Sequence, residues 1–178
     1  MKAKFNFMFI SLVKRFLFLA LFFFFWSNNS HSRHSTKLYD WSLGFRLGYP
    51  TAVSIKHYVK PNFSLEGITA FQRQNQKASW VQIALAAQYN MPINNSRNFN
   101  WFLGTGLSVY RWNWSQGFNG EDNRKTVFGT FVQLGFDYKF KKVPINLSLD
   151  WMPYYQFTGY NNGLTITGGA ASIRYVFQ

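Results

Sequence analysis

The chain has 178 residues, which allows one domain, and it carries 19 Lys and Arg residues against six Asp and Glu residues. It contains no cysteine, so a disulfide framework and a thiolate metal site are both excluded. A basic chain in which 21% of the residues are aromatic could bind nucleic acid. Here the aromatic residues recur at strand spacing and the chain has an export signal, so we expect no nucleic-acid partner.

The N-terminal stretch has the features of a secretory signal peptide. Lys14 and Arg15 precede an apolar run, Phe16–Trp26, whose length falls within the roughly 7–15 residues of a signal's apolar region. A membrane-spanning helix would need about 20 residues, so a retained anchor is the weaker interpretation. We expect cleavage near Ser32, which leaves residues 33–39 as a short periplasmic segment before a barrel at 40–178 and lowers the net charge to about +9.

Alternation of apolar and polar residues with a period of two predicts eight strands and no spanning helix in the rest of the chain. Most of them reach the roughly 9–11 residues that a tilted strand needs to cross a bilayer. The expected strands are Asp40–Gly48, Thr51–Val59, Phe63–Gln72, Ser79–Asn90, Phe99–Arg111, Thr126–Phe140, Ile145–Met152 and Leu164–Phe177.

The two faces of these strands differ in a way that favours a membrane barrel. One face is apolar, as in Leu43, Phe45 and Leu47 of the first strand. The opposite face is polar, small or charged, and it holds seven glycines: Gly44, Gly48, Gly104, Gly106, Gly129, Gly135 and Gly168. Glycine weakens an ordinary strand, but an eight-stranded barrel has an interior barely wide enough for side chains. The charged face is therefore the confined one, and the apolar face meets lipid.

The end of the chain and its first hairpin resemble those of known membrane barrels. Ile173, Tyr175 and Phe177 alternate up to a closing aromatic, which resembles the C-terminal insertion signal of bacterial outer-membrane β-barrel proteins. The stretch Gly44–His57 resembles the first hairpin of Bacteroidetes-type barrel proteins. The resemblance implies a monomeric barrel in the outer membrane of a Gram-negative bacterium, inserted by the barrel-assembly machinery. Short turns at one rim and longer loops at the other agree with it.

Seven charged residues fall on the lumen face by parity: Arg46, Lys56, Glu66, Asp137, Lys139, Asp150 and Arg174. Lys56 and Glu66 are symmetric about the Pro61 turn, so they should lie opposite each other, and Asp150 and Arg174 are candidates for a pair across the last two strands. Such charges could form an ion path. They could instead fill the interior with ion pairs, which we favour because eight strands leave little open lumen.

His57 is the one histidine that the pattern places on a strand, and it falls on the lipid-facing side. Barrel lipid A deacylases use a lipid-facing histidine and serine with a carboxylate, so a hydrolase centred on His57 is an alternative. Ile55 and Val59, its neighbours on the same face, offer neither partner. We therefore expect no catalytic residue and no cofactor. We also expect no metal site, because the adjacent carboxylates of Glu121 and Asp122 are a poor ligand set.

The longer loops carry the remaining candidate contacts. Cationic and aromatic side chains gather there at the level expected for lipopolysaccharide phosphates. They are Arg73, Lys77, Arg111, Trp112, Trp114, Arg124 and Lys125. The sequence thus predicts an all-β, antiparallel, eight-stranded up-and-down transmembrane barrel. Its expected role is structural or surface-binding, and a hydrolase or a small-solute pore are the alternatives.

Overall fold

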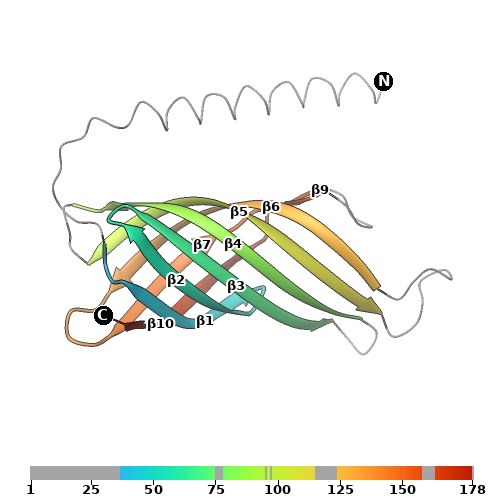
Figure 1. Cartoon of the computed structure of the whole chain (residues 1–178), viewed down its shortest axis with the longest axis horizontal. Helices are drawn as coiled ribbons and strands as arrows, with labels where there is room; N and C mark the ends of the chain where they lie inside the picture. The colour runs from blue at the N-terminus through green and yellow to red at the C-terminus, as the bar shows by residue number, and fades with distance from the viewer. Residues whose placement is uncertain are drawn as a thin grey trace, which may run out of the picture. The chain divides into compact units, whose positions relative to one another are not determined.

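The computed structural model describes residues 37–74, 78–94, 96, 98–114, 124–157 and 163–177. These residues form one antiparallel sheet in the order β5-β4-β3-β2-β1-β10-β7-β6-β8-β9, which the pairing of β5 with β6 closes into a barrel (Figure 1). The strands are β1 (Trp41–Tyr49), β2 (Ala52–Lys60), β3 (Phe63–Gln74), β4 (Ala78–Pro92), β5 (Phe99–Trp114), β6 (Arg124–Lys139), β7 (Ile145–Trp151), β8 (Tyr154–Gln156), β9 (Gly163–Thr165) and β10 (Gly169–Phe177).

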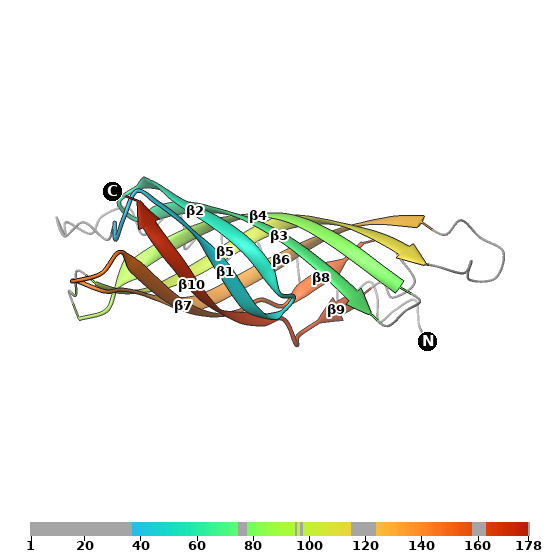
Figure 2. The same ribbon diagram turned by 90° about the horizontal axis from the view of Figure 1, so that it is seen from below.

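The two rims of the barrel differ. Trp41 at the start of β1 pairs with Phe177 at the end of β10, so both ends of the barrel sequence lie at one rim, which we call the turn end (Figure 2). The β2–β3, β4–β5 and β6–β7 connections lie there too, and the opposite rim is the loop end. The wall is uneven toward the loop end, since β1 and β2 have 9 residues each whereas β5 and β6 have 16 each.

Eight wall segments follow the predicted order, but the seventh is interrupted at Met152-Pro153. The register between β6 and this segment is the same on both sides of the break, with Leu134 opposite Trp151 and Phe131 opposite Tyr154. Pro153 has no N–H to donate to the ladder, although its carbonyl still accepts a bond from the Val132 N–H at 3.1 Å. β7 and β8 are thus one strand with a proline interruption.

The last predicted strand, Leu164–Phe177, was wrong as a single regular strand. Trp151 lies opposite Gly169 and Tyr154 lies opposite Thr165, so residues 166–168 face only residues 152 and 153. One extra residue shifts the register, as in a β-bulge, and it exchanges the two faces of the strand. Even-numbered Leu164 and Ile166 are therefore exposed before the shift, and odd-numbered Ile173, Tyr175 and Phe177 after it.

The barrel has an apolar outside and a polar inside, as the alternation predicted. Large apolar side chains are exposed along the wall. Examples are Phe45, Leu107 and Leu149, whose exposed fractions are 62%, 69% and 61%. Charged side chains such as Arg46, Glu66 and Arg174 are buried. This is the fold of transmembrane β-barrels and the reverse of a soluble barrel.

Within the described residues, no helix is long and apolar enough to cross a membrane.

Two of the predicted lumen glycines leave room for aromatic rings. A Cβ on Gly106 would lie 2.3 Å from Cζ of Phe131, and a Cβ on Gly135 would lie 2.6 Å from Cζ of Phe102. Both rings point into the lumen and are almost fully buried. The glycines therefore fit a narrow interior, which larger side chains from neighbouring strands fill.

Candidate functional site

The lumen has three levels, which can be followed along the inward side chains of β2. Ala52 lies toward the loop end, Lys56 in the middle and Tyr58 toward the turn end, and all three are buried. Ala52 belongs to an apolar and aromatic group, and Tyr58 belongs to a smaller apolar group. Between them lies the ion-pair layer, which we define as Arg46, Lys56, Glu66, Asp137, Asp150 and Arg174.

Glu66 is the centre of the ion-pair layer. Its Oε1 lies 2.5 Å from Nη2 of Arg174 and 3.3 Å from Nη1 of Arg46. Its Oε2 accepts a bond from Nε2 of Gln88 at 2.6 Å and a longer one from Nε2 of Gln133 at 3.4 Å. One carboxylate thus joins two guanidinium groups and two amides that come from different strands.

The remaining charges complete a balanced set. Nη2 of Arg46 lies 2.7 Å from Oδ1 of Asp150, and Nζ of Lys56 lies 2.5 Å from Oδ2 of Asp137. Nζ of Lys56 also lies 4.5 Å from the ring centroid of Phe102, a cation–π distance. Each of these six side chains is 1% exposed or less, and three cations face three anions. Such burial is tolerable because every charge is paired.

Cross-strand register alone does not give the ion pairs. Lys56 does lie opposite Glu66, as predicted, but its ion pair is with Asp137. The suggested pairing of Asp150 with Arg174 was wrong, because Arg174 lies opposite Asn146 and its ion pair is with Glu66. Long side chains cross the narrow lumen and form ion pairs with residues on strands that are not their neighbours. Lys139 lies half-buried at the end of β6 and forms no ion pair with the described residues.

A lower apolar cluster of Leu38, Tyr39, Tyr58 and Val176 closes the turn end. The ring of Tyr39 packs edge-on against Tyr58 with centroids 5.0 Å apart, and its hydroxyl donates to Oδ2 of Asp137 at 3.4 Å. Burial raises the pKa of Tyr39 well above its usual value, so the phenol stays a neutral donor. The segment before β1 therefore contributes to the filling of the lumen.

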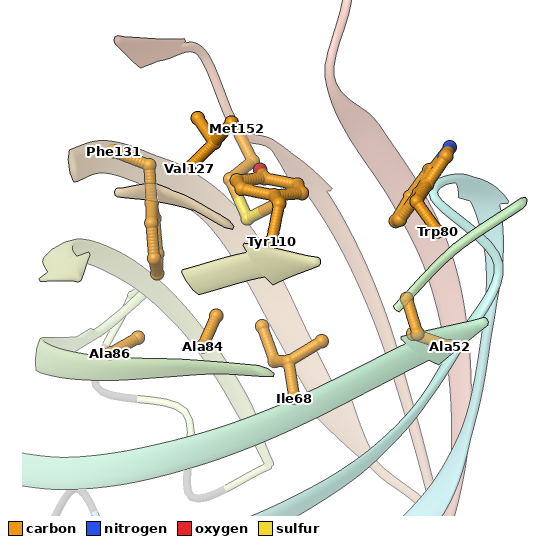
Figure 3. Close-up of a cluster of buried hydrophobic side chains, with 10 residues drawn as sticks. Ala52, Ile68, Trp80, Ala84, Ala86, Tyr110, Val127, Phe131 and Met152 are labelled. Atoms are coloured by element: carbon orange, nitrogen blue, oxygen red, sulfur yellow. The ribbon is translucent and has the colours of Figure 1, made fainter. Parts of the chain in front are cut away.

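Toward the loop end the lumen holds a cluster of buried apolar side chains with the rings of Trp80, Tyr110 and Phe131 among them, a feature that the sequence analysis missed (Figure 3). Trp80 is its centre, with ring centroids 5.8 Å from Tyr110, 5.9 Å from Trp112 and 6.3 Å from Tyr49. Tyr110 continues the contacts to Tyr154 at 6.2 Å. We call these five residues the aromatic cluster. Trp80 alternates with the outward Val81 and Ile83 on β4, and Tyr110 shares the parity of Gly104 and Gly106 on β5, so strict alternation could have placed both rings inside.

Four buried polar atoms in or beside the aromatic cluster have no hydrogen-bond partner: Oε1 of Gln72, Nε1 of Trp80, Oε1 of Gln82 and Oγ of Ser108. Gln72 lies opposite Trp80 in the β3–β4 register, and Gln82 is the next inward residue along β4. Gln82 is fully buried, and its Nε2 donates to the hydroxyl of Tyr110 at 2.8 Å. Such atoms also occur in the ion-pair layer, at Oδ1 of Asp137 and Oδ2 of Asp150.

The predicted loop-end contacts are only partly brought together. Arg73 and Arg111 are exposed on β3 and β5, whereas Trp112 is half-buried and belongs to the aromatic cluster. Lys77 lies outside the described residues, as do the side chains of Trp114, Arg124 and Lys125. Arg73 and Arg111 therefore remain as the described outer cations.

His57 has a structural environment at the turn end. Its Nδ1 lies 2.9 Å from the backbone oxygen of Asp40, and its ring stacks on Trp41 with centroids 3.9 Å apart. Its register partners are Trp41 and Leu65, neither of which carries a hydroxyl or a carboxylate. Within the described residues, no group of three or more His, Asp or Glu side chains could hold a metal ion.

No family model and no curated protein matches this sequence. Two solved structures show a similar fold. The N-terminal β-barrel domain of Pseudomonas aeruginosa OprF is 10% identical, with a TM-score of 0.56 over 77% of this chain and 95% of that chain. Neisserial surface protein A (NspA) is 16% identical, with a TM-score of 0.47 over 78% of this chain and 94% of that chain. The likeness to the OprF domain shows that the two chains share the small closed β-barrel fold.

Proposed function

We propose that this chain is an integral outer-membrane β-barrel protein of a Gram-negative bacterium, with a structural or surface-binding role and a lumen closed to ions. The observation that carries the proposal is the distribution of the two faces. Exposed Leu85 and Leu107, which are register partners, would meet acyl chains, whereas the ion-pair layer lies inside. The alternation up to Phe177 and the first hairpin support insertion by the barrel-assembly machinery and a Bacteroidetes-type relationship.

The membrane location is tested by placing a charge on the lipid-facing side. Leu85→Arg should cost about 2–4 kcal/mol in vesicles, because a cation near the middle of a bilayer is unfavourable on the outside of a barrel. Thr51→Arg, on the exposed β1–β2 turn, is the control and should change little. When cells are fractionated, the wild-type protein should be found in the outer membrane, with its mature N-terminus near Ser32. Recovery of wild-type protein as a soluble monomer without detergent would rule the proposal out.

The closed lumen is tested in planar bilayers. The wild type should give no steady conductance, since Glu66, Arg46 and Arg174 are bonded to one another across the lumen. The lower apolar cluster adds a second closure at the turn end. A stable open channel would instead favour the small-solute pore.

We also propose that Arg73 and Arg111 bind phosphates of lipopolysaccharide at the outer leaflet. All the described carboxylates except that of Asp40 are buried in the lumen, so no described carboxylate faces these arginines on the outside of the wall. Arg73→Gln/Arg111→Gln should weaken association with lipopolysaccharide-containing vesicles relative to phosphatidylcholine vesicles. Lys141→Gln/Lys142→Gln removes the same charge at the turn end and is the matched control. Equal effects of the two pairs would contradict a specific outer contact.

A further inference from the structure

We infer that residues 37–40 form a plug that closes the turn end of the lumen and can leave it while the barrel wall stays folded. We call this segment the N-terminal plug. The inference deepens the closed lumen of the proposed function, on which it rests for the direction in which the turn end faces. It adds a barrier that is separate from the ion-pair layer and that controls access to this layer from the periplasmic side.

The N-terminal plug lies inside the mouth of the barrel. Leu38 and Tyr39 precede β1, yet they are only 7% and 4% exposed, because they belong to one buried cluster with Tyr58 of β2 and Val176 of β10. The hydroxyl of Tyr39 donates to Oδ2 of Asp137 on β6 at 3.4 Å. Because β6 is not a neighbour of β1 in the sheet, the plug reaches across the lumen to another part of the wall.

The plug covers the ion-pair layer on the side of the turn end. The inward residues of β10 follow one another from Val176 at the turn end to Arg174 and then Ser172 farther in. Val176 belongs to the lower apolar cluster together with both plug side chains, whereas Arg174 belongs to the ion-pair layer. A molecule that enters the lumen from the turn end must therefore pass Leu38 and Tyr39 before it meets Arg174.

The plug is attached firmly at one end only. The backbone oxygen of Asp40 accepts bonds from the Tyr58 N–H at 3.1 Å and from Nδ1 of His57 at 2.9 Å, so Asp40 continues the β1–β2 ladder. Lys37 forms its ion pair with Asp40, inside the plug itself. Within the described part of the chain, no ion pair joins the plug to the wall. Segments held by few bonds open at low cost, so the plug should open well before the wall unfolds.

The plug and the ion-pair layer share one oxygen atom. Oδ2 of Asp137 accepts the Tyr39 hydroxyl and lies 2.5 Å from Nζ of Lys56. Release of the plug should therefore expose the Lys56–Asp137 pair to water, whereas the two ion pairs of Glu66 do not involve the plug and remain. The two barriers lie in series, and opening the first does not open the second.

The experiment measures whether a thiol behind the plug can be reached from water. The chain has no cysteine, so one introduced cysteine is the only thiol. Val176→Cys places it behind the plug, and Ser172→Cys places it on the same face of β10 beyond Arg174. The hydroxyl of Ser172 has no hydrogen-bond partner, so this control removes no bond. The probe is a water-soluble trimethylammonium methanethiosulfonate, and mass spectrometry follows the labelling of the purified protein in detergent.

Leu38→Ser/Tyr39→Ser removes both buried side chains of the plug and keeps Asp40. This change should speed the labelling of Val176→Cys by at least about tenfold, because apolar burial no longer holds the segment in the lumen. Ser172→Cys should react slowly with and without it. Tyr39→Phe is a milder second variant, which removes only the bond to Asp137 and tests the plug even where the double variant does not fold. It should speed the labelling of Val176→Cys by about twofold to fivefold.

Three results would overturn the inference. Equal labelling of Val176→Cys with the wild-type plug and with both plug variants would show that residues 37–40 do not cover this position. An equal increase at Ser172→Cys would show that the lumen opens as a whole and that the plug is not separable from the wall. A steady conductance of the plug variants in planar bilayers would show that the ion-pair layer is not a second barrier. Because the conductance test of the closed lumen uses the wild type, the two proposals fail separately.

Discussion

The ion-pair layer and the aromatic cluster lie in the same lumen, but the first is charged and the second is neutral. Every charged side chain of the ion-pair layer has an oppositely charged partner, and Glu66 and Arg46 each have two. One oxygen each of Asp137 and Asp150 accepts no hydrogen bond. In or beside the aromatic cluster, Trp80, Gln72, Gln82 and Ser108 each have an unpaired neutral atom. The difference follows from cost, because an unpaired buried charge is far more expensive than an unpaired neutral dipole. A buried charge in this lumen therefore requires an opposite charge, whereas a neutral side chain does not.

The largest expected effect is at the centre of the ion-pair layer. Glu66→Gln leaves Arg46 and Arg174 without their shared carboxylate, and it should lower the free energy of unfolding by about 3–5 kcal/mol. Urea unfolding in lipid vesicles, followed by tryptophan fluorescence, measures the change. Asp40→Asn, which disrupts the solvent-exposed Lys37–Asp40 pair, should cost less than about 1 kcal/mol. Similar costs for Glu66→Gln and Asp40→Asn would show that the buried ion pairs contribute no more to stability than the exposed pair.

The second pair of the layer should give a somewhat smaller effect. Lys56→Met leaves Asp137 without its cation but with the Tyr39 hydroxyl, so we expect a cost of about 3 kcal/mol. Adding Asp137→Asn removes the unpaired negative charge of Asp137. The double variant should therefore be more stable than the sum of the single effects predicts. Strict additivity in this double-mutant cycle would show that the two charges do not act as a pair.

A packing prediction concerns the glycine beside Phe131. Gly106→Ala places a Cβ against both the ring of Phe131 and the backbone oxygen of Leu85, and it should cost about 1–3 kcal/mol in the same unfolding assay. Gly67→Ala is the matched control on the outer face, where the added methyl meets only Cγ2 of Ile55 at 3.3 Å. If Gly67→Ala is the more damaging of the two, the lumen is wider than the structure shows.

The smallest effect is expected in the aromatic cluster. Tyr110→Phe removes the acceptor for Nε2 of Gln82 but keeps the ring contacts with Trp80 and Tyr154, so it should cost about 1 kcal/mol. A loss as large as that of Glu66→Gln would mean that neutral and charged groups contribute equally to the lumen, against the comparison made above.

Much of the fold could be predicted from alternation alone, because a two-residue period and a narrow interior leave few arrangements. The order of the strands, the lipid-facing leucines and the inward charges all follow from parity. The partners of Arg174 and Asp150 do not, since these side chains cross the lumen and register describes only neighbouring strands. The aromatic cluster was not predicted, because the inward face was expected to carry polar, small or charged side chains, whereas Trp80 and Tyr110 are large aromatic residues.

The extra residue at 166–168 has a consequence for altering the length of this strand. Deleting Thr167 alone would leave residues 168 and 166 opposite residues 152 and 153, so the strand would alternate regularly from Leu164 to Phe177 with Leu164 and Ile166 still exposed. A single insertion or deletion elsewhere in this strand would instead exchange the inward and outward faces of the residues beyond it. Loop grafts at this rim should therefore be joined on the N-terminal side of Gly163, so that the phase change stays where it is.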